Sequence, residues 1–243
     1  MSGDVAKLIS KIYYINLDKR VDRKEFMENQ LKAFDIPCER FPAVLVEREE
    51  LLNDNGKYHD YYLRCSPRGG PNFKLAIETG NRFTNVRGLI GGCISATTLY
   101  EKLLTENYDS NILILEDDCV LKAGWYEILE EFFEKYTDFV ENWDMLRCVW
   151  SQENRKYVTR WTRDHRETKR AKGKTTNNYG GAHFTLINKN SIQKIYDYLI
   201  SDYCLSIDGL YGTTQLNVYH AKFGGTVDYL PEHLSDCDPK SEH

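Results

Sequence analysis

The segment NILILEDDCVL, residues 111–121, decides the fold of this chain. Four aliphatic residues lead directly into three consecutive carboxylates, Glu116, Asp117 and Asp118, and apolar residues then resume. A short apolar run of this length is typical of a strand that is buried on both faces of a sheet. In an α/β sheet, ligands bind beyond the carboxyl ends of the strands. We therefore expect the three acids to face solvent and a ligand, and not the core.

The spacing of the three acids indicates a metal site. On an extended backbone alternate side chains share a face, so Glu116 and Asp118 are expected to point together and Asp117 away. Two converging carboxylates repel each other unless a cation lies between them. Hard oxygen ligands select Mg²⁺ or Mn²⁺, and these ions take phosphate oxygens as further ligands. The pattern predicts a divalent metal that holds a diphosphate; the alternative is that the acids only favour the start of the next helix.

Strand and helix patterns alternate along the rest of the chain. Besides residues 112–115, strands are predicted at 11–18, 38–44, 143–150 and 182–187. Helices are predicted around Met27, Leu31 and Phe34, from Leu89 to Thr105, from Trp125 to Phe133, and from Ile192 to Ile200. A strand followed directly by a helix at the start of the chain suggests a parallel sheet with crossover helices. The Asn, Gly and Pro residues between 47 and 87 predict a long functional or mobile loop.

Length and composition set limits on the class of protein. The 243 residues suffice for one large α/β domain, and no linker rich in Pro, Gly or Ser divides them. The net charge of −5 gives no general attraction to nucleic acid or to a membrane surface. We expect no signal peptide and no membrane span. The seven cysteines contain no CxxC pair, which predicts reduced thiols and a cytoplasmic location.

Several motifs, in order, resemble glycosyltransferase family 25, which contains bacterial lipopolysaccharide glycosyltransferases and procollagen galactosyltransferases. They are KIYYINLDKRVDRKEFMENQL (11–31), IPCERFPAV (36–44), GGCISATTLYEKLL (91–104), ILILEDDCVL (112–121) and WDML (143–146). Similarity continues more thinly in NYGGAHFTLINKNSIQKI (178–195) and SIDGL (206–210). One departure is Ala96, because the family commonly has His after the Ser of its G-C-x-x-S element.

The resemblance implies a GT-A type fold, a single α/β domain with a Rossmann-like mixed sheet flanked by helices. Residues of about 10–150 are then the nucleotide-sugar-binding half, and about 151–243 the acceptor-binding half. The implied reaction transfers galactose or glucose from a UDP-sugar, with Mn²⁺ or Mg²⁺, to a hydroxyl on a glycan, lipopolysaccharide or hydroxylysine-type acceptor, with inversion. The sequence carries no sign of the oligomeric state.

The resemblance also implies individual roles. Asp118 contacts the metal directly, and Glu116 contacts it through water or holds the ribose hydroxyls. A late histidine, His220 or His233, is a candidate further ligand, although a lone His is more often an ordinary residue. The residues expected to bind the nucleotide sugar are Asn16, Leu17, Asp18, Arg23, Val44, Ser95, Glu116, Asp117 and Gly181.

Inverting transfer needs one base that deprotonates the acceptor hydroxyl. Asp208 is the candidate base by resemblance; its alternative role is the N-cap of a helix that begins near Gly209. Asp144 either contacts the acceptor or donor, or caps its strand. The basic stretch 155–174 is a flap over the diphosphate, a docking surface for an acidic acceptor, or a solvated loop.

Two other hypotheses stay open at this point. A catalytically inactive family member would act as a carbohydrate- or nucleotide-binding module, and Ala96 keeps that alternative in view. A sugar nucleotidyltransferase also uses metal-bound acids, but it requires a glycine-rich signature near the first strand, and INLDKRVDR (15–23) contains no glycine.

Overall fold

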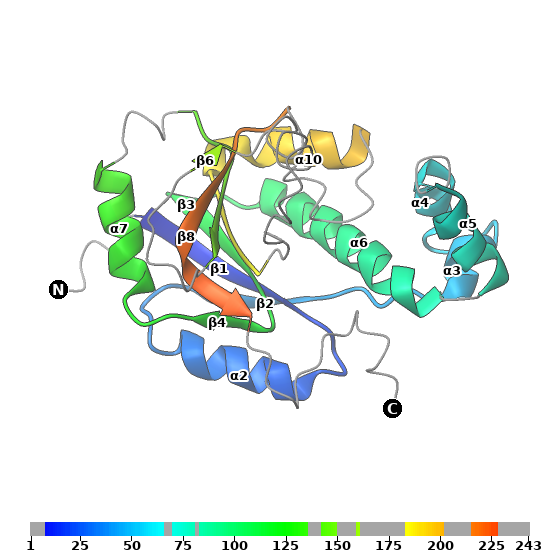
Figure 1. The fold of residues 1–243 in the computed structure, drawn as a ribbon, viewed down its shortest axis with the longest axis horizontal. Coiled ribbons are helices and arrows are strands. Elements are labelled where there is room, and N and C mark those ends of the chain that lie inside the picture. The colour runs from blue at the N-terminus through cyan, green and yellow to red at the C-terminus, as the bar shows by residue number, and fades with distance from the viewer. Residues whose placement is uncertain are drawn as a thin grey trace, which may run out of the picture.

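The computed structural model describes residues 8–65, 70–80, 83–135, 142–149, 159–160, 183–201 and 215–227. Within these ranges the strands are β1 (Ile9–Asn16), β2 (Cys38–Pro42), β3 (Asn111–Glu116), β4 (Cys119–Leu121), β5 (Met145–Val149), β6 (Thr159–Arg160), β7 (Phe184–Ile187) and β8 (Val218–Val227). They form one sheet in the order β2-β1-β3-β7-β5-β8-β4, and β6 pairs with β8. The prediction of an α/β fold with a mixed sheet is confirmed (Figure 1).

The strand pairing brings three carboxyl ends to one edge of the sheet. β1 runs parallel to both β2 and β3, with Asn16 beside Pro42 and Ile15 beside Glu116. β7 is antiparallel to β3 and to β5, which makes the sheet mixed. The parallel part therefore places the ends of β1, β2 and β3 together, where an α/β sheet offers a binding site.

Helices cover both faces of the sheet. Helices α2 (Val21–Leu31) and α7 (Trp125–Lys135) pack on the face that carries Tyr14, Leu113 and Leu115. Helices α6 (Phe83–Thr105) and α10 (Ile192–Ser201), the latter preceded by η1 (Lys189–Ser191), pack on the opposite face, which carries Tyr13 and Ile114. Neighbouring residues of one strand thus enter opposite cores, because side chains alternate along a strand.

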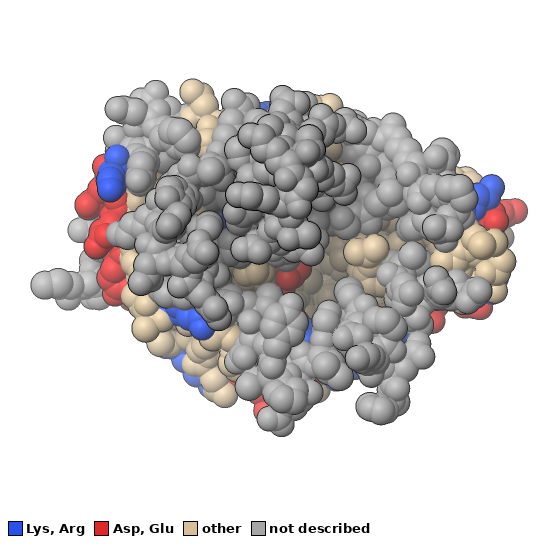
Figure 2. All heavy atoms as spheres, viewed as in Figure 1, with Lys and Arg blue, Asp and Glu red and all other residues tan. Residues whose placement is uncertain are grey.

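Helix α7 shows why these segments form surface helices. Trp125, Leu129 and Phe132 are buried, whereas Glu127 and Glu131 are exposed, which is the pattern of a helix with one apolar face. Figure 2 shows acidic side chains gathered at the edge of the molecule where Figure 1 places α7. None of the helices in the described ranges is long and apolar enough to cross a membrane.

The prediction of a long loop between 47 and 87 is wrong. This segment contains α3 (Arg48–Leu52), α4 (His59–Cys65) and α5 (Gly70–Thr79), which lie beside the beginning of α6 at the right of Figure 1. Leu51 and Ile77 pack against Ile90 of α6 in a small core of their own. The Asn, Gly and Pro residues of this segment do mark turns, but the turns connect short helices that the sequence pattern did not predict.

Two local signals explain these short helices. Glu47 and Glu50 form a capping box at the start of α3, with the Glu47 N–H donating to Glu50 Oε2 at 2.8 Å. Arg48 donates from Nε to the Ile77 carbonyl at 2.6 Å and from Nη2 to the Glu78 carbonyl. Its guanidinium thereby satisfies carbonyls at the end of α5 that have no partner within the helix.

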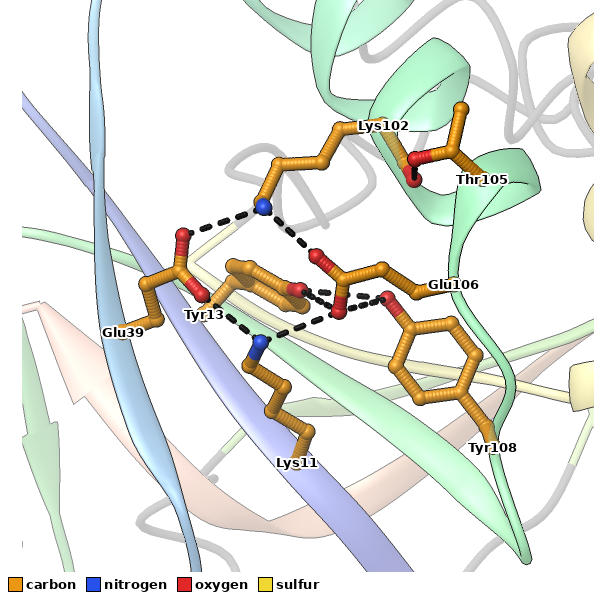
Figure 3. Close-up of polar contacts among 7 residues, drawn as sticks. All are labelled: Lys11, Tyr13, Glu39, Lys102, Thr105, Glu106 and Tyr108. Carbon is orange, nitrogen blue, oxygen red and sulfur yellow. Dashed lines mark hydrogen bonds and ion pairs between the residues drawn. The ribbon is translucent and has the colours of Figure 1, made fainter.

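The end of α6 is fastened to β1 by a charged cluster centred on Glu106 (Figure 3). The Glu106 carboxylate accepts hydrogen bonds from Lys102 Nζ at 2.5 Å, Lys11 Nζ at 3.0 Å, Tyr13 Oη at 2.9 Å and Tyr108 Oη at 3.1 Å. The hydrogen bond from the Lys102 ammonium is the largest cause that holds the pKa of Glu106 at about 2, against the opposing effect of burial. Because α6 also forms one wall of the candidate site, this cluster fixes the direction of that wall.

Candidate active site

A pocket of about 210 Å³ lies at the carboxyl ends of β1 and β3. Its walls are the end of β1, residues 43–45 after β2, the acidic turn after β3, and the first half of α6. Glu116, Asp117 and Asp118 all line it. The structure thus places the acidic triplet at a cavity at the ligand-binding edge of the sheet, as the strand pattern indicated.

The alternation assumed for the three acids does not apply beyond Glu116. β3 ends at Glu116 and residues 117–118 form a turn, so the backbone is no longer extended there. Asp117 accepts from Arg23 Nη1 at 2.6 Å and from Asn16 Nδ2 at 2.8 Å. Asp117 was expected to point away from the other two acids, but it lines the same pocket and its position is set by two buried partners.

Asp118 is held more loosely and has unused bonding capacity. Its Oδ2 lies 3.7 Å from Arg23 Nη1, and its Oδ1 is buried and accepts no hydrogen bond from the residues that the structure describes. Burial raises the pKa of Asp118; the Arg23 charge opposes this shift and Asp117 adds to it. A buried carboxylate oxygen without a partner is costly, and a bound cation removes that cost.

The acidic turn fits a hard divalent cation that shares its ligands with a substrate. The described ranges contain no group of three His, Cys, Asp or Glu side chains that could hold a metal by themselves. Mg²⁺ and similar ions are usually bound by one or two carboxylates together with phosphate oxygens and waters, so a full protein cage is not required. Asp118, with Glu116 on the same wall, provides this type of partial ligand set.

Asn16 lies behind the acidic turn and does not line the pocket. It is buried; its amide donates to Asp117 and to the Arg20 carbonyl at 3.1 Å, and its Oδ1 accepts from Arg40 Nε at 2.8 Å. Asp18 is exposed and pairs with Arg40 at 2.5 Å, also outside the pocket lining. In this structure the polar groups of Asn16 and Asp18 bond to Arg40, Asp117 and the Arg20 carbonyl, and the nucleoside contacts expected for them stay a prediction. The sequence reasoning missed Arg40.

The segment after the acidic turn is also tied to α2. Gln30 donates to the Cys119 carbonyl at 2.7 Å, and its Oε1 accepts from the Leu121 N–H at 3.2 Å. Together with Arg23, which comes from the same helix, this amide pair holds both ends of the turn. The position of the acids is thus determined mainly by α2.

Ser95 fastens one wall of the pocket to another. Its hydroxyl donates to the Gly91 carbonyl at 2.6 Å and accepts from the Val44 N–H at 2.8 Å. A Cβ on Gly91 would lie 2.3 Å from the Val44 oxygen, whereas a Cβ on Gly92 would meet nothing within 4 Å. Ser95 and Val44, both predicted to bind the nucleotide sugar, line the pocket. The Ser95 hydroxyl itself bonds to Gly91 and Val44 of the pocket wall.

Asp144 lies at the opposite edge of the sheet. Ile187 pairs with both Ile112 and Met145, so β5 begins level with the start of β3 and not with its acidic end. The buried Asp144 accepts from Ser191 Oγ at 2.7 Å, from Lys194 Nζ at 2.5 Å and from the Asn217 N–H at 2.7 Å. A catalytic role predicted for Asp144 is not supported, because its acceptor capacity joins β5, α10 and β8.

The remaining predicted site residues differ in where the structure places them. Leu17 and Arg23 line the pocket. The backbone of His220 pairs with Arg147 of β5, and its role as a metal ligand stays a prediction. Gly181, Asp208, His233 and most of the basic stretch 155–174 lie outside the described residues.

A mixed α/β sheet with a carboxylate turn and basic side chains around one pocket is a site suited to a metal-bound, phosphorylated substrate. The model of the family described as "Glycosyltransferase family 25 (LPS biosynthesis protein)" matches residues 9–208. This chain belongs to glycosyltransferase family 25 and is a glycosyltransferase.

Comparison with curated proteins gives no match. Among solved structures, the chain is similar to that in "Crystal Structure of A197 from STIV", with 10% sequence identity and a TM-score of 0.40. That similarity covers 87% of this chain and 81% of the other.

Proposed function

We propose that this glycosyltransferase transfers a hexose, galactose or glucose, from a UDP-sugar to an acceptor hydroxyl, and that Mn²⁺ or Mg²⁺ binds at the acidic turn. The observation that carries the metal is the buried Asp118 oxygen, which lacks a hydrogen-bond donor among the described residues and borders the pocket. The choice of UDP and of the hexose rests on the resemblance of the motifs to the family. The acceptor is a glycan, a lipopolysaccharide or a hydroxylysine-type side chain.

In this proposal, residues that line the pocket and residues outside its lining have different roles. Asp118 and Glu116 hold the cation, which when bound supplies positive charge to the departing diphosphate. Asn16 and Arg23 are positioning residues: they hold Asp117 and thereby the turn that presents Asp118. Asp208 stays the predicted base, because it lies inside the family match but outside the described residues.

Part of the pocket wall is apolar. Ile114, Leu99 and Met145 line it from β3, α6 and β5. An apolar wall excludes water from a reacting sugar, which favours transfer to the acceptor over hydrolysis. Gly92 and Ala96 on α6 present little side chain to the same space, and this leaves room for a ring against the helix.

The metal assignment is tested with Asp118→Asn and a matched control. UDP binding is measured by calorimetry with and without Mn²⁺, and UDP release from a panel of UDP-sugars is followed over time. Asp118→Asn is expected to lower Mn²⁺-dependent UDP affinity at least about tenfold without lowering Tm, because a metal ligand is lost and an unsatisfied buried charge is removed. Glu134→Gln removes the same charge from the exposed face of α7 and is expected to change neither.

The outcomes separate the rival hypotheses. Unchanged Mn²⁺-dependent affinity in Asp118→Asn would show that the acidic turn is not the metal site. UDP binding without any release from UDP-sugars or transfer to acceptors would identify a catalytically inactive binding module. Release of pyrophosphate from UTP and a sugar phosphate would identify a nucleotidyltransferase instead.

A further inference from the structure

The charged side chains that line the pocket differ in how far they already pair with other residues of the protein. Its acids are Glu116, Asp117 and Asp118, and its bases are Lys19, Arg23 and Arg87. Arg23 is committed to the acids, at 2.6 Å from Asp117 and 3.7 Å from Asp118. Lys19 also has a polar contact within the protein.

Arg87 differs from the other two bases. Its side chain is half-buried, and it forms no hydrogen bond or ion pair with the part of the chain that the structure describes. An arginine in this situation keeps its full set of donors for a ligand. Arg87 is thus a cation of the pocket whose charge is available to an anion.

The position of Arg87 is fixed by the helix that carries it. Arg87 stands one helical turn before Gly91, on the same face of α6. Gly91 approaches the Val44 carbonyl so closely that no Cβ fits, and Ser95 one turn later bonds both Gly91 and Val44. The α6 wall therefore cannot move away from residues 43–45.

We propose that Arg87 binds the diphosphate of the donor and stabilises it as the leaving group. This inference rests on the proposed donor. The planar guanidinium matches phosphate oxygens through paired N–H donors, and it remains charged at any working pH. Arg87 on α6 and the acidic turn after β3 line the same pocket, so both are in reach of a diphosphate bound there.

The chemistry requires such a group. In the proposed transfer, the bond between the anomeric carbon and the β-phosphate oxygen breaks, and its electron pair stays on that oxygen. The acceptor oxygen bonds to the anomeric carbon, and its proton passes to a carboxylate base. Negative charge therefore grows on the diphosphate, where a fixed cation stabilises the transition state more than the ground state.

The test uses uridine, UMP and UDP as probes, each with Mn²⁺, on the full chain. Arg87→Met keeps the aliphatic stem and removes the guanidinium. Lys24→Met removes one positive charge from α2, where the Lys24 side chain is 44% exposed and pairs with Glu28 at 3.8 Å, and serves as the control. Arg87→Met is expected to weaken UDP binding about ten- to hundredfold and to leave uridine binding unchanged. Arg87→Lys is expected to recover only part of the loss.

Each result has a distinct meaning. Equal UDP affinity in the wild type and in Arg87→Met overturns the role of Arg87 and leaves the proposed function intact. Equal weakening of uridine and UDP also overturns it, because it shows a structural effect on the pocket. A raised KM for the acceptor alone assigns Arg87 to an acceptor anion and contradicts the proposal. A wild type that binds none of the three probes refutes the proposed donor, and this inference with it.

Discussion

Two adjacent glycines of α6 are expected to respond to alanine in opposite directions. Gly91 and Gly92 both lie in the interior of a long helix and both line the pocket. In a helix interior, replacement of Gly by Ala stabilises by about 0.5–1 kcal/mol, because the unfolded chain loses conformational freedom. Any difference between the two variants therefore reports on what the added methyl group meets.

The geometry assigns the sign of each effect. At Gly91 the new Cβ lies 2.3 Å from the Val44 oxygen, a backbone atom that cannot rotate away. Relief of that overlap costs about 1–3 kcal/mol, and a weakened Ser95–Val44 hydrogen bond costs about 1 kcal/mol more. Against the helical gain, Gly91→Ala is expected to destabilise by about 1–3 kcal/mol. At Gly92 nothing lies within 4 Å, so only the gain remains.

Thermal unfolding of the two variants checks this reasoning. For a chain of this length 1 kcal/mol shifts Tm by about 2–4 °C, so Gly91→Ala is expected to melt several degrees below the wild type and Gly92→Ala slightly above it. Calorimetric titration of a UDP-hexose with Mn²⁺ then tests the site. Gly92→Ala is expected to bind a UDP-hexose less tightly despite its higher Tm, because its methyl group occupies the pocket. A Gly91→Ala variant as stable as Gly92→Ala would refute the close contact between α6 and Val44.

Two further predictions concern residues away from the pocket. Asp144→Ala is expected to lower the free energy of unfolding, measured in urea, by about 2–4 kcal/mol, because three hydrogen bonds are lost and Lys194 loses its partner. The UDP affinity of the folded protein is expected to stay unchanged. A selective loss of turnover would instead indicate a catalytic role for Asp144. Glu106→Gln is expected to cost about 1–2 kcal/mol at pH 6, after allowance for the partial exposure of the side chain. Since the pKa of Glu106 is held at about 2, this contribution is complete above its ordinary value of 4.5 and fades as pH falls toward 2, so the two proteins should converge in free energy of unfolding. A constant difference from pH 6 to pH 2.5 would contradict the ion pairs with Lys11 and Lys102.

The sequence predicted those features that depend on local order along the chain. The apolar run before Glu116 marked a strand that is buried on both faces, and helical spacing around Trp125 and Ile192 marked α7 and α10. The order of the family motifs predicted the class of enzyme. The helices of residues 48–79 escaped because they are short, and short helices depend on caps and packing more than on periodicity.

The bonding partners at the site were decided only by the tertiary structure. Asp117 is held by Arg23, 94 residues away in sequence, because α2 packs under the turn at the end of β3. The position of Asp144 follows from the pairing of β5 with β7, which local patterning does not specify. Strand alternation named Glu116 and Asp118 as the working pair, but the chain turns at 117–118 and each acid takes its own surroundings.

By itself, then, the sequence determined that a buried strand ends in acids at the ligand-binding edge of an α/β sheet in a family 25 glycosyltransferase. The sequence predicts these features because strand burial and motif order depend on residues that are neighbours along the chain. Among the described residues, the folded chain decided which acid has a buried oxygen without a hydrogen bond, and which arginine of the pocket forms no ion pair. Those properties arise from contacts between distant segments, since the charge of a buried side chain acts on a ligand only where no other part of the protein has already neutralised it.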